Sequence, residues 1–104
     1  MAAHYPNLQL ALDTGHCLVT QDIAPEEAIR RYAHDLGTVS VEDMRVGDQT
    51  HLPFGEGDMD LPAVIGALNQ IAFEGLVCVE YSRESSRAHL AIPEAIAALR
   101  AAGA

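Results

Sequence analysis

Acidic residues end three short apolar segments of this chain. The segments cover residues 10–13, 39–43 and 77–80, and a loop and a helix-like pattern follow each of them. Carboxylates can bind a divalent cation or move a proton, and ligands of parallel sheets bind beyond the carboxyl ends of the strands. Functional side chains are therefore expected within one group of residues, namely Asp13, His16, Glu42, Asp43 and Glu80.

The apolar segments predict parallel strands that are covered on both faces. We expect these strands at residues 8–13, 38–43 and 76–81, spaced by about one β-loop-α-loop repeat. A closed eight-stranded barrel typically needs about 250 residues. This chain has 104, a length that fits one domain with three β/α units.

Three helices are predicted around these strands. Pro25 suits a first helical position, and Gly37 suits a left-handed cap. Residues 14–16 are expected to form a turn out of the first strand. The helices are expected at residues 25–36, between the cap Asp60 and Gly75, and at residues 91–102.

A long segment without periodicity, residues 44–60, follows the second strand and holds four glycine or proline residues. Loops of this length in a compact domain are often functional, and residues 53–58 are expected to form a rigid turn held over a site. Glu42 and Asp43 are expected to anchor this loop.

The composition argues against two kinds of partner. The formal charge is −9, from 15 acidic and 6 basic residues, and the basic residues are scattered, so a nucleic-acid surface is not expected. No apolar run reaches the roughly 18 residues of a membrane span, and the first residues lack the layout of a secretory signal. The default expectation is a soluble cytoplasmic protein. Cys17 and Cys78 lack C-x-x-C spacing and are predicted to be buried thiols.

Four motifs in sequence order carry a resemblance to a known family. They are Asp-Thr-Gly-His at 13–16, Val-Glu-Asp-Met-Arg at 41–45, His-Leu-Pro-Phe-Gly-Glu-Gly-Asp at 51–58 and Val-Glu-Tyr-Ser at 79–82. Together they resemble the last three β/α units of the xylose-isomerase-like sugar phosphate isomerase/epimerase family. The resemblance implies an α/β fold of three parallel β/α units equivalent to the C-terminal part of a TIM barrel. Residues 1–104 would form a single partial-barrel domain.

The resemblance also implies a metal site and a class of substrate. Family members hold a divalent metal among a Glu, an Asp, a His and a second Glu at the ends of the last four barrel strands. By position, Asp13 matches the metal-binding Asp, and Glu80 matches the final Glu, which is both a ligand and a catalytic acid/base. His16 and Arg45 match residues that face the substrate, a sugar or sugar phosphate.

Two departures from the family pattern weaken this expected site. Ser40 stands where the metal-binding His is usual, and the first Glu would lie on a strand ahead of Asn7. Two carboxylate ligands remain, so binding of Mn, Mg or Zn is expected to be weak and the chain to be inactive alone. His51 precedes a Pro-Phe-Gly turn and has two interpretations, a substrate contact or a replacement for the missing His.

These features leave three interpretations of function. The leading one is a metal-dependent sugar isomerase/epimerase-like protein, whose carboxylates move a proton between neighbouring carbons. The rival is a non-catalytic interaction module, or a subunit that completes a barrel with another chain or copy. A metal-dependent abasic-site endonuclease of the same barrel type is less favoured, because it would need more histidines and a basic DNA face.

Unpaired edges at the first and third strands predict assembly. Neither strand carries the proline or lysine that shields an exposed edge from pairing. We therefore expect a homo-oligomer, most simply a homodimer, or a complementing chain.

Overall fold

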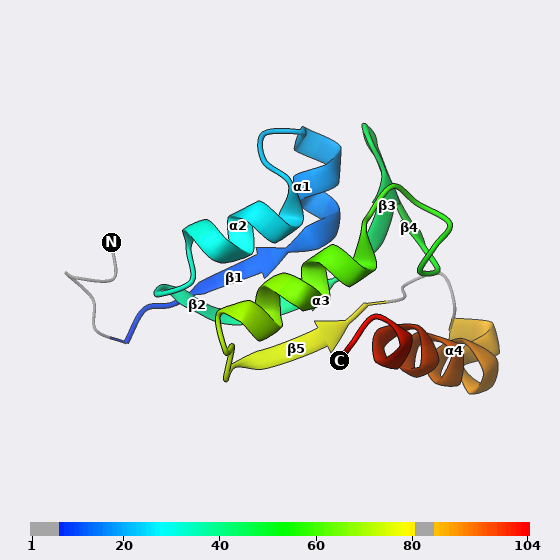
Figure 1. Ribbon diagram of the computed structural model, residues 1–104. Helices are drawn as coiled ribbons and strands as arrows, with labels where there is room; N and C mark the ends of the chain where they lie inside the picture. The colour runs from blue at the N-terminus through cyan, green and yellow to red at the C-terminus, as the bar shows by residue number, and fades with distance from the viewer. Residues whose placement is uncertain (1–6, 81–84) are drawn as a thin grey trace.

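The computed structural model describes residues 7–80 and 85–104 (Figure 1). Tyr81 and Ser82, which belong to the last of the four motifs, lie outside the described residues. In chain order, the elements are β1 (Leu10–Asp13), α1 (Thr14–Thr20), α2 (Pro25–Arg31), β2 (Leu36–Val41), β3 (Asp43–Arg45), β4 (Asp48–Leu52), α3 (Leu61–Gln70), β5 (Leu76–Val79), the 3-10 helix η1 (Ser85–Arg87) and α4 (Ala88–Ala101).

Three strands form one parallel sheet in the order β1-β2-β5. The register pairs Asp13 with Ser40 across β1 and β2, and Ser40 with Cys78 across β2 and β5. β1 and β5 are therefore the two edges, and the described residues close no barrel. The predicted fold class, three parallel β/α units of a partial barrel, is confirmed.

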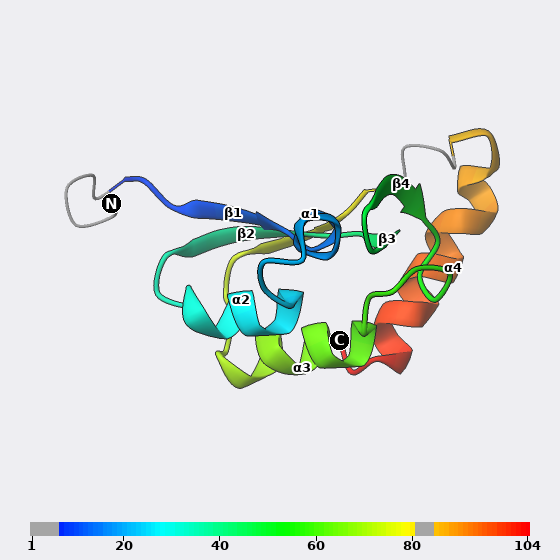
Figure 2. The same cartoon turned by 90° about the horizontal axis from the view of Figure 1, so that it is seen from above.

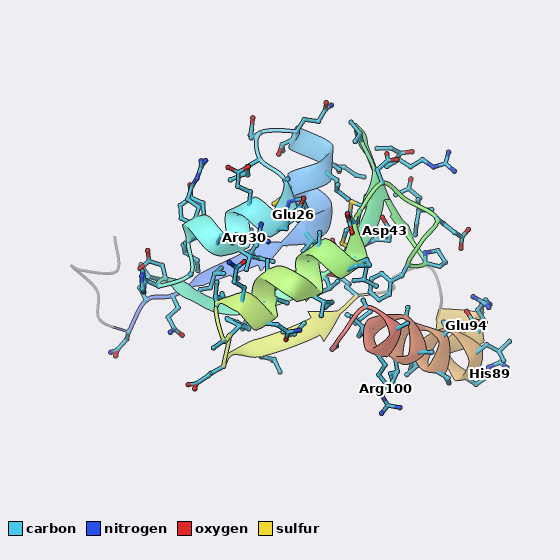
Figure 3. All side chains as sticks on the ribbon, viewed as in Figure 1. Glu26, Arg30, Asp43, His89, Glu94 and Arg100 are labelled. Carbon is cyan, nitrogen blue, oxygen red and sulfur yellow. The ribbon has the colours of Figure 1, made fainter. Side chains whose placement is uncertain are left out.

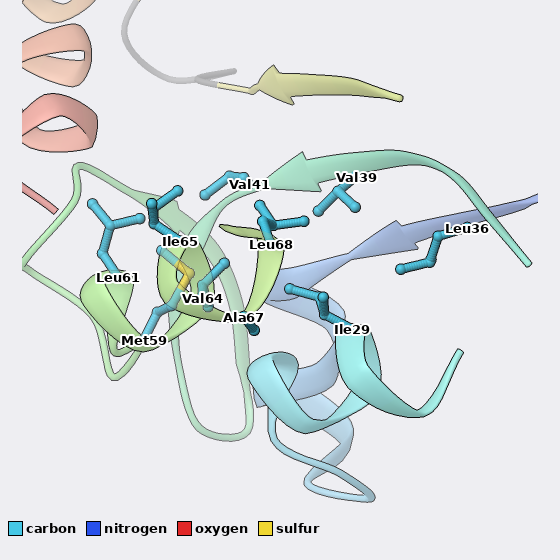
Figure 4. Packing of buried hydrophobic residues seen from close by; sticks show 10 residues of the cluster. All are labelled: Ile29, Leu36, Val39, Val41, Met59, Leu61, Val64, Ile65, Ala67 and Leu68. Atoms are coloured by element: carbon cyan, nitrogen blue, oxygen red, sulfur yellow. The ribbon is translucent and has the colours of Figure 1, made fainter. Parts of the chain in front are cut away.

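Helices α2 and α3 cover one face of this sheet, and the other face is left open (Figure 2). Val39 and Val41 of β2 are fully buried on the covered face. Figure 4 shows them packed against the side chains of α3 and against Ile29 of α2. The buried core cluster consists of Ile29, Leu36, Val39, Val41, Met59, Leu61, Val64, Ile65, Ala67 and Leu68.

Side chains alternate between the two faces along each strand. Because Val39 and Val41 face the helices, Ser40 faces the open side. The register carries this alternation to the neighbouring strands, so Asp13 and Cys78 also lie on the open side. The polar residues near the carboxyl ends of the strands are thus collected on the face that no helix covers.

Helix α2 is shorter than the helix predicted over residues 25–36. It begins at Pro25, as expected, but ends at Arg31. Leu36 is 7% exposed and pairs with β1, and Gly37 follows it in the strand instead of forming a left-handed cap. Burial of Leu36 in the sheet outweighs the helical pattern of its neighbours.

Helix α3 begins where the sequence predicts and ends early. Asp60 caps it, since its Oδ1 accepts a hydrogen bond from the backbone N–H of Ala63 (3.0 Å). The helix ends at Gln70, well before Gly75. Ala72 takes a left-handed backbone conformation (φ 52°), which the helical pattern did not reveal.

Two elements were missed by the sequence analysis. Residues 14–16, predicted as a turn, begin helix α1, which continues to Thr20. The predicted loop at residues 44–60 contains most of the antiparallel hairpin β3-β4, in whose turn Gly47 has φ 77°. Both elements affect the candidate site, because α1 carries His16 and β4 carries His51.

Helix α4 lies at the end of the sheet toward which the strands point (Figures 1 and 2). Ala98 and Leu99 pack against the core, whereas His89, Glu94 and Arg100 extend away from it (Figure 3).

In the described ranges, no helix is long and apolar enough to cross a membrane. The two cysteines are unpaired, and both are only partly buried, so the prediction of buried thiols was too strong.

Candidate metal centre

Three carboxylates meet at the carboxyl ends of the parallel strands. Asp13 ends β1, Glu42 directly follows β2, and Glu80 directly follows β5. Two groups of potential ligands form here, Asp13 with His16 and Glu42, and Glu42 with His51 and Glu80. Within each group the ligand atoms lie within 4.8 Å of one another. Glu42 belongs to both groups, so its carboxylate lies at the centre of the cluster.

The position of Glu42 is fixed by the start of helix α1. The Thr14 hydroxyl donates to the backbone carbonyl of Glu42 (2.9 Å) and accepts from its backbone N–H (2.8 Å). The Glu42 side chain then occupies space that a residue with a Cβ at position 15 would need. A Cβ built on Gly15 would lie 2.9 Å from Glu42 Oε2 and 2.8 Å from Met44 Cε. Thr14 therefore holds the backbone of Glu42, and the missing Cβ of Gly15 leaves room for the Glu42 carboxylate.

Burial makes the charge on Glu42 costly. The residue is 1% exposed. Its pKa is raised to about 9, first by burial and then by hydrogen bonding to, and repulsion from, the carboxyl groups of Asp13 and Glu80. Glu42 Oε1 lies 3.0 Å from Nδ1 of His51. Within the described residues, no N–H group donates to either Glu42 oxygen in hydrogen-bond geometry, and His51 Nδ1 has no such partner.

The neighbouring residue Asp43 has a different role. It is 1% exposed, begins strand β3 of the hairpin and lies near the start of α3 (Figure 3). Its carboxylate accepts hydrogen bonds from the backbone N–H groups of Gly55 (2.9 Å), Gly57 (3.1 Å) and Met59 (3.0 Å). Asp43 therefore anchors the turn at residues 53–58, as predicted. The Glu42 side chain points to the other side, toward the cluster, because consecutive residues of an extended chain alternate in direction, and it approaches His51 of the same segment (3.0 Å).

The other predicted site residues differ in how close they come to this cluster. His16 is exposed on α1, and its backbone N–H donates to Asp13 Oδ1 (3.1 Å). His51 joins the cluster from β4, and Glu80 joins it from the end of β5. Arg45 is exposed at the end of β3, opposite Asp48, and no described hydrogen bond links it to the carboxylates. A substrate contact by Arg45 stays a prediction.

The donor set fits a divalent cation. Carboxylate oxygens and an imidazole nitrogen are the ligands preferred by manganese and zinc. Among the described residues, the buried Glu42 oxygens and His51 Nδ1 have no hydrogen-bond partner, and a bound cation would satisfy them. Glu42 was among the functional residues expected from the sequence, but its place among the potential ligands was not predicted. It stands two positions after Ser40, so the two-residue period of a strand could have placed it on the open face.

The family model for the xylose isomerase-like TIM barrel matches residues 2–102. The chain belongs to this family. In TIM barrels the active site lies at the carboxyl ends of the strands. In this xylose isomerase-like chain, Asp13, Glu42 and Glu80 lie at the corresponding ends. No protein of curated function matches the sequence.

Solved structures with the same fold include sugar epimerases. A xylose isomerase domain protein from Planctomyces limnophilus is 19% identical, with a TM-score of 0.78 over 93% of this chain and 38% of that one. A D-allulose 3-epimerase from Methylomonas sp. is 18% identical, with a TM-score of 0.70 over 95% and 38%. An IolI protein with a bound zinc atom is 24% identical, with a TM-score of 0.64 over 97% and 38%. The xylose isomerase-like chain thus spans 38% of the length of these proteins.

Proposed function

We propose that this chain provides part of the active site of a metal-dependent sugar isomerase or epimerase. The observation that carries the proposal is the convergence of Asp13 and Glu80, with Glu42 between them, at the carboxyl ends of parallel strands. Membership of the xylose isomerase-like family supports it. Similarity to epimerases such as the D-allulose enzyme supports the fold on which this chemistry occurs.

Each residue then has a defined task. Asp13 and Glu80 would hold the cation, which when bound polarises a carbonyl and a hydroxyl of the sugar. Glu80 is exposed at the site and would take a proton from the carbon next to the carbonyl and return it during isomerisation. His16, exposed beside Asp13, would donate to or accept from a sugar hydroxyl. Either a sugar or a sugar phosphate suits this scheme.

Catalysis would need protein atoms that this sequence does not supply. An epimerase needs a second acid/base group on the opposite side of the reacting carbon. The family places that carboxylate on an earlier strand, and this chain spans only 38% of the similar structures. We therefore propose that these 104 residues alone are inactive and that further β/α units, for instance those of another chain or a second copy, complete the barrel.

Ser40 favours one rival function. A serine at the metal-binding histidine position is a poor ligand, and a non-catalytic interaction module would have no need of a better one. The two functions differ in one measurable property, because a module that only binds a partner has no affinity for sugars.

Sugar binding tests the proposal directly. The chain loaded with Mg²⁺ or Zn²⁺ is titrated with ketohexoses and ketose phosphates, and amide shifts near His16 and Glu80 are followed by NMR. We expect saturable shifts with a Kd of roughly millimolar, lost in Asp13→Asn and Glu80→Gln but kept in Glu56→Gln, which changes an exposed turn residue. Absence of shifts with every sugar would contradict the proposal and favour the interaction module.

Catalysis is tested in a completed barrel. The chain is fused to the preceding β/α units of the similar D-allulose 3-epimerase, and exchange of the sugar carbon proton with deuterated water is measured. The fusion is expected to exchange this proton, and Glu80→Gln to abolish the exchange. A folded fusion that binds metal and sugar without exchange would contradict an acid/base role for Glu80.

A further inference from the structure

We propose that Glu42 is a metal ligand in this chain and replaces the histidine that is missing at Ser40. With His51, Asp13 and Glu80 it would form a site of three carboxylates and one imidazole. This inference rests on the proposed metal-dependent function and deepens it, because it assigns two ligands that the family pattern does not give.

The strand geometry explains how the replacement works. Ser40 lies on the open face of β2, paired with Asp13 on one side and Cys78 on the other. Glu42 stands two residues later, directly beyond the end of the strand, and therefore projects to the same face. Its side chain is longer than that of Ser40, and its carboxylate reaches both ligand groups of the cluster.

The burial of Glu42 points to a ligand. A carboxylate that is 1% exposed and receives no N–H donor from the described part of the chain is costly to keep buried. Oε1 lies 3.0 Å from His51 Nδ1, which also lacks a donor or acceptor in hydrogen-bond geometry. Two unsatisfied atoms of ligand type that face each other in a buried space are the arrangement that a cation would satisfy.

The chain also fixes both ligands in place. Thr14 holds the backbone of Glu42 through two hydrogen bonds, and Gly15 leaves space for its carboxylate. The hairpin β3-β4 carries His51 back toward the sheet. Asp43 ties the following turn to the base of this hairpin. Ligands positioned by packed neighbours lose little entropy when a metal binds.

Four donors change the expected affinity. Asp13 and Glu80 alone predict binding no tighter than roughly millimolar. Addition of a buried carboxylate and an imidazole predicts micromolar binding, with Zn²⁺ tighter than Mn²⁺ in line with the general order of divalent affinities. Mg²⁺, which prefers oxygen ligands and retains several waters, should bind most weakly.

Titration calorimetry of the purified chain with Zn²⁺ and Mn²⁺ tests the inference. We expect micromolar binding with one ion per chain, weakened about ten- to a hundredfold by Glu42→Gln or His51→Gln. Two matched controls, Ser40→Ala and Glu56→Gln, should bind like the parent chain, since neither side chain belongs to the cluster. NMR spectra of each variant verify that it is folded.

The outcomes separate this inference from the function on which it rests. If Asp13→Asn and Glu80→Gln abolish binding while Glu42→Gln binds like the parent, Glu42 is not a ligand and the metal-dependent function stands. If the parent chain binds only at millimolar concentration, the four-ligand site is refuted. If the parent chain binds neither metal nor sugar, the proposed function fails as well.

Discussion

Oε1 of the buried Glu42 lies 3.0 Å from Nδ1 of His51, although Glu42 follows a strand of the parallel sheet and His51 belongs to the two-stranded antiparallel sheet. Glu42 follows the parallel strand β2, and His51 lies on β4 of the antiparallel hairpin. The hairpin therefore brings an imidazole to the carboxyl ends of the parallel strands. Four predictions follow from the way the neighbouring residues hold this pair and the sheet beneath it.

Replacement of Gly15 by alanine should disturb the cluster. The new Cβ would meet Glu42 Oε2 and Met44 Cε, both on side chains that are buried and have little room to move. Urea unfolding should show a decrease of about 1–3 kcal/mol in the free energy of unfolding, which is typical of overpacking, and calorimetry should show weaker metal binding.

Gly66→Ala is the control, because a Cβ at this position in the middle of α3 would meet nothing within 4 Å. Helix propensity predicts that this control is more stable than the parent by about 0.5–1 kcal/mol. Equal stability of parent and Gly15→Ala would show that Glu42 is free to move.

Asp43→Asn should release the turn at residues 53–58. An asparagine has one acceptor oxygen for three backbone N–H groups, and its own amide would face some of these donors. Loss of a charged acceptor predicts a cost of about 2–4 kcal/mol in the free energy of unfolding. Asp58→Asn should cost less than about 1 kcal/mol, because Asp58 is exposed and, among the described residues, its carboxylate accepts one hydrogen bond, from the backbone N–H of Val46. Similar costs for both variants would contradict an anchoring role specific to Asp43.

Glu42→Gln should have opposite effects with and without metal. In chelator at neutral pH, Glu42 of the parent chain must take up a proton on folding, because burial and the carboxyl groups of Asp13 and Glu80 raise its pKa to about 9. Glutamine is neutral in both states and avoids this cost, so the variant should gain about 1–2 kcal/mol. With saturating Zn²⁺ the parent chain should become the more stable of the two, since ligand binding adds to stability. Urea titrations of both proteins under both conditions measure this reversal. A parent chain that is more stable in chelator would argue that Glu42 is satisfied by the protein itself.

The chain should self-associate through the edges of its sheet. β1 and β5 are unpaired along one side in the described structure, and Leu76 is 62% exposed on β5. Sedimentation equilibrium at ~100 μM, well above the Kd of a specific interface, is expected to give a dimer. Leu76→Lys should favour the monomer without unfolding it, because lysine on an edge strand opposes pairing. A stable monomer of the parent chain at this concentration would refute the prediction.

The sequence predicted the elements that bury apolar side chains at regular spacing. The three strands and their parallel arrangement follow from short runs such as Val39 to Val41, and Pro25 and Asp60 marked two helix starts. Local pattern could not show that Leu36 belongs to the sheet, since its burial depends on pairing with a strand distant in sequence.

The sequence predicted which carboxylates lie near the candidate site, but not that Glu42 lies between Asp13 and Glu80. Asp13, Glu42 and Glu80 were expected at the site because they end apolar runs, and the structure brings the first and last of them close to Glu42. Glu42 and Asp43 were both expected to anchor the loop, and the pattern did not reveal that Glu42 is shared by two ligand groups, because the extended backbone sends the two side chains to opposite sides. Helix α1 was missed because Thr14 and Gly15 are poor helix formers, and capping by Asp13 outweighs their propensities.

If a second chain covers the open face of the sheet, as proposed above, the activity of the assembly would depend on dilution. Among the described residues, helices α2 and α3 shield one side of the strands, and the side that holds Asp13 and Glu80 is open to water unless further protein covers it (Figure 2). A proton held by such a site exchanges with bulk water before it can be returned to a substrate carbon. The rate per chain would therefore rise with chain concentration and level off only when every chain is paired, whereas an enzyme with a complete barrel has a rate per chain that dilution leaves unchanged.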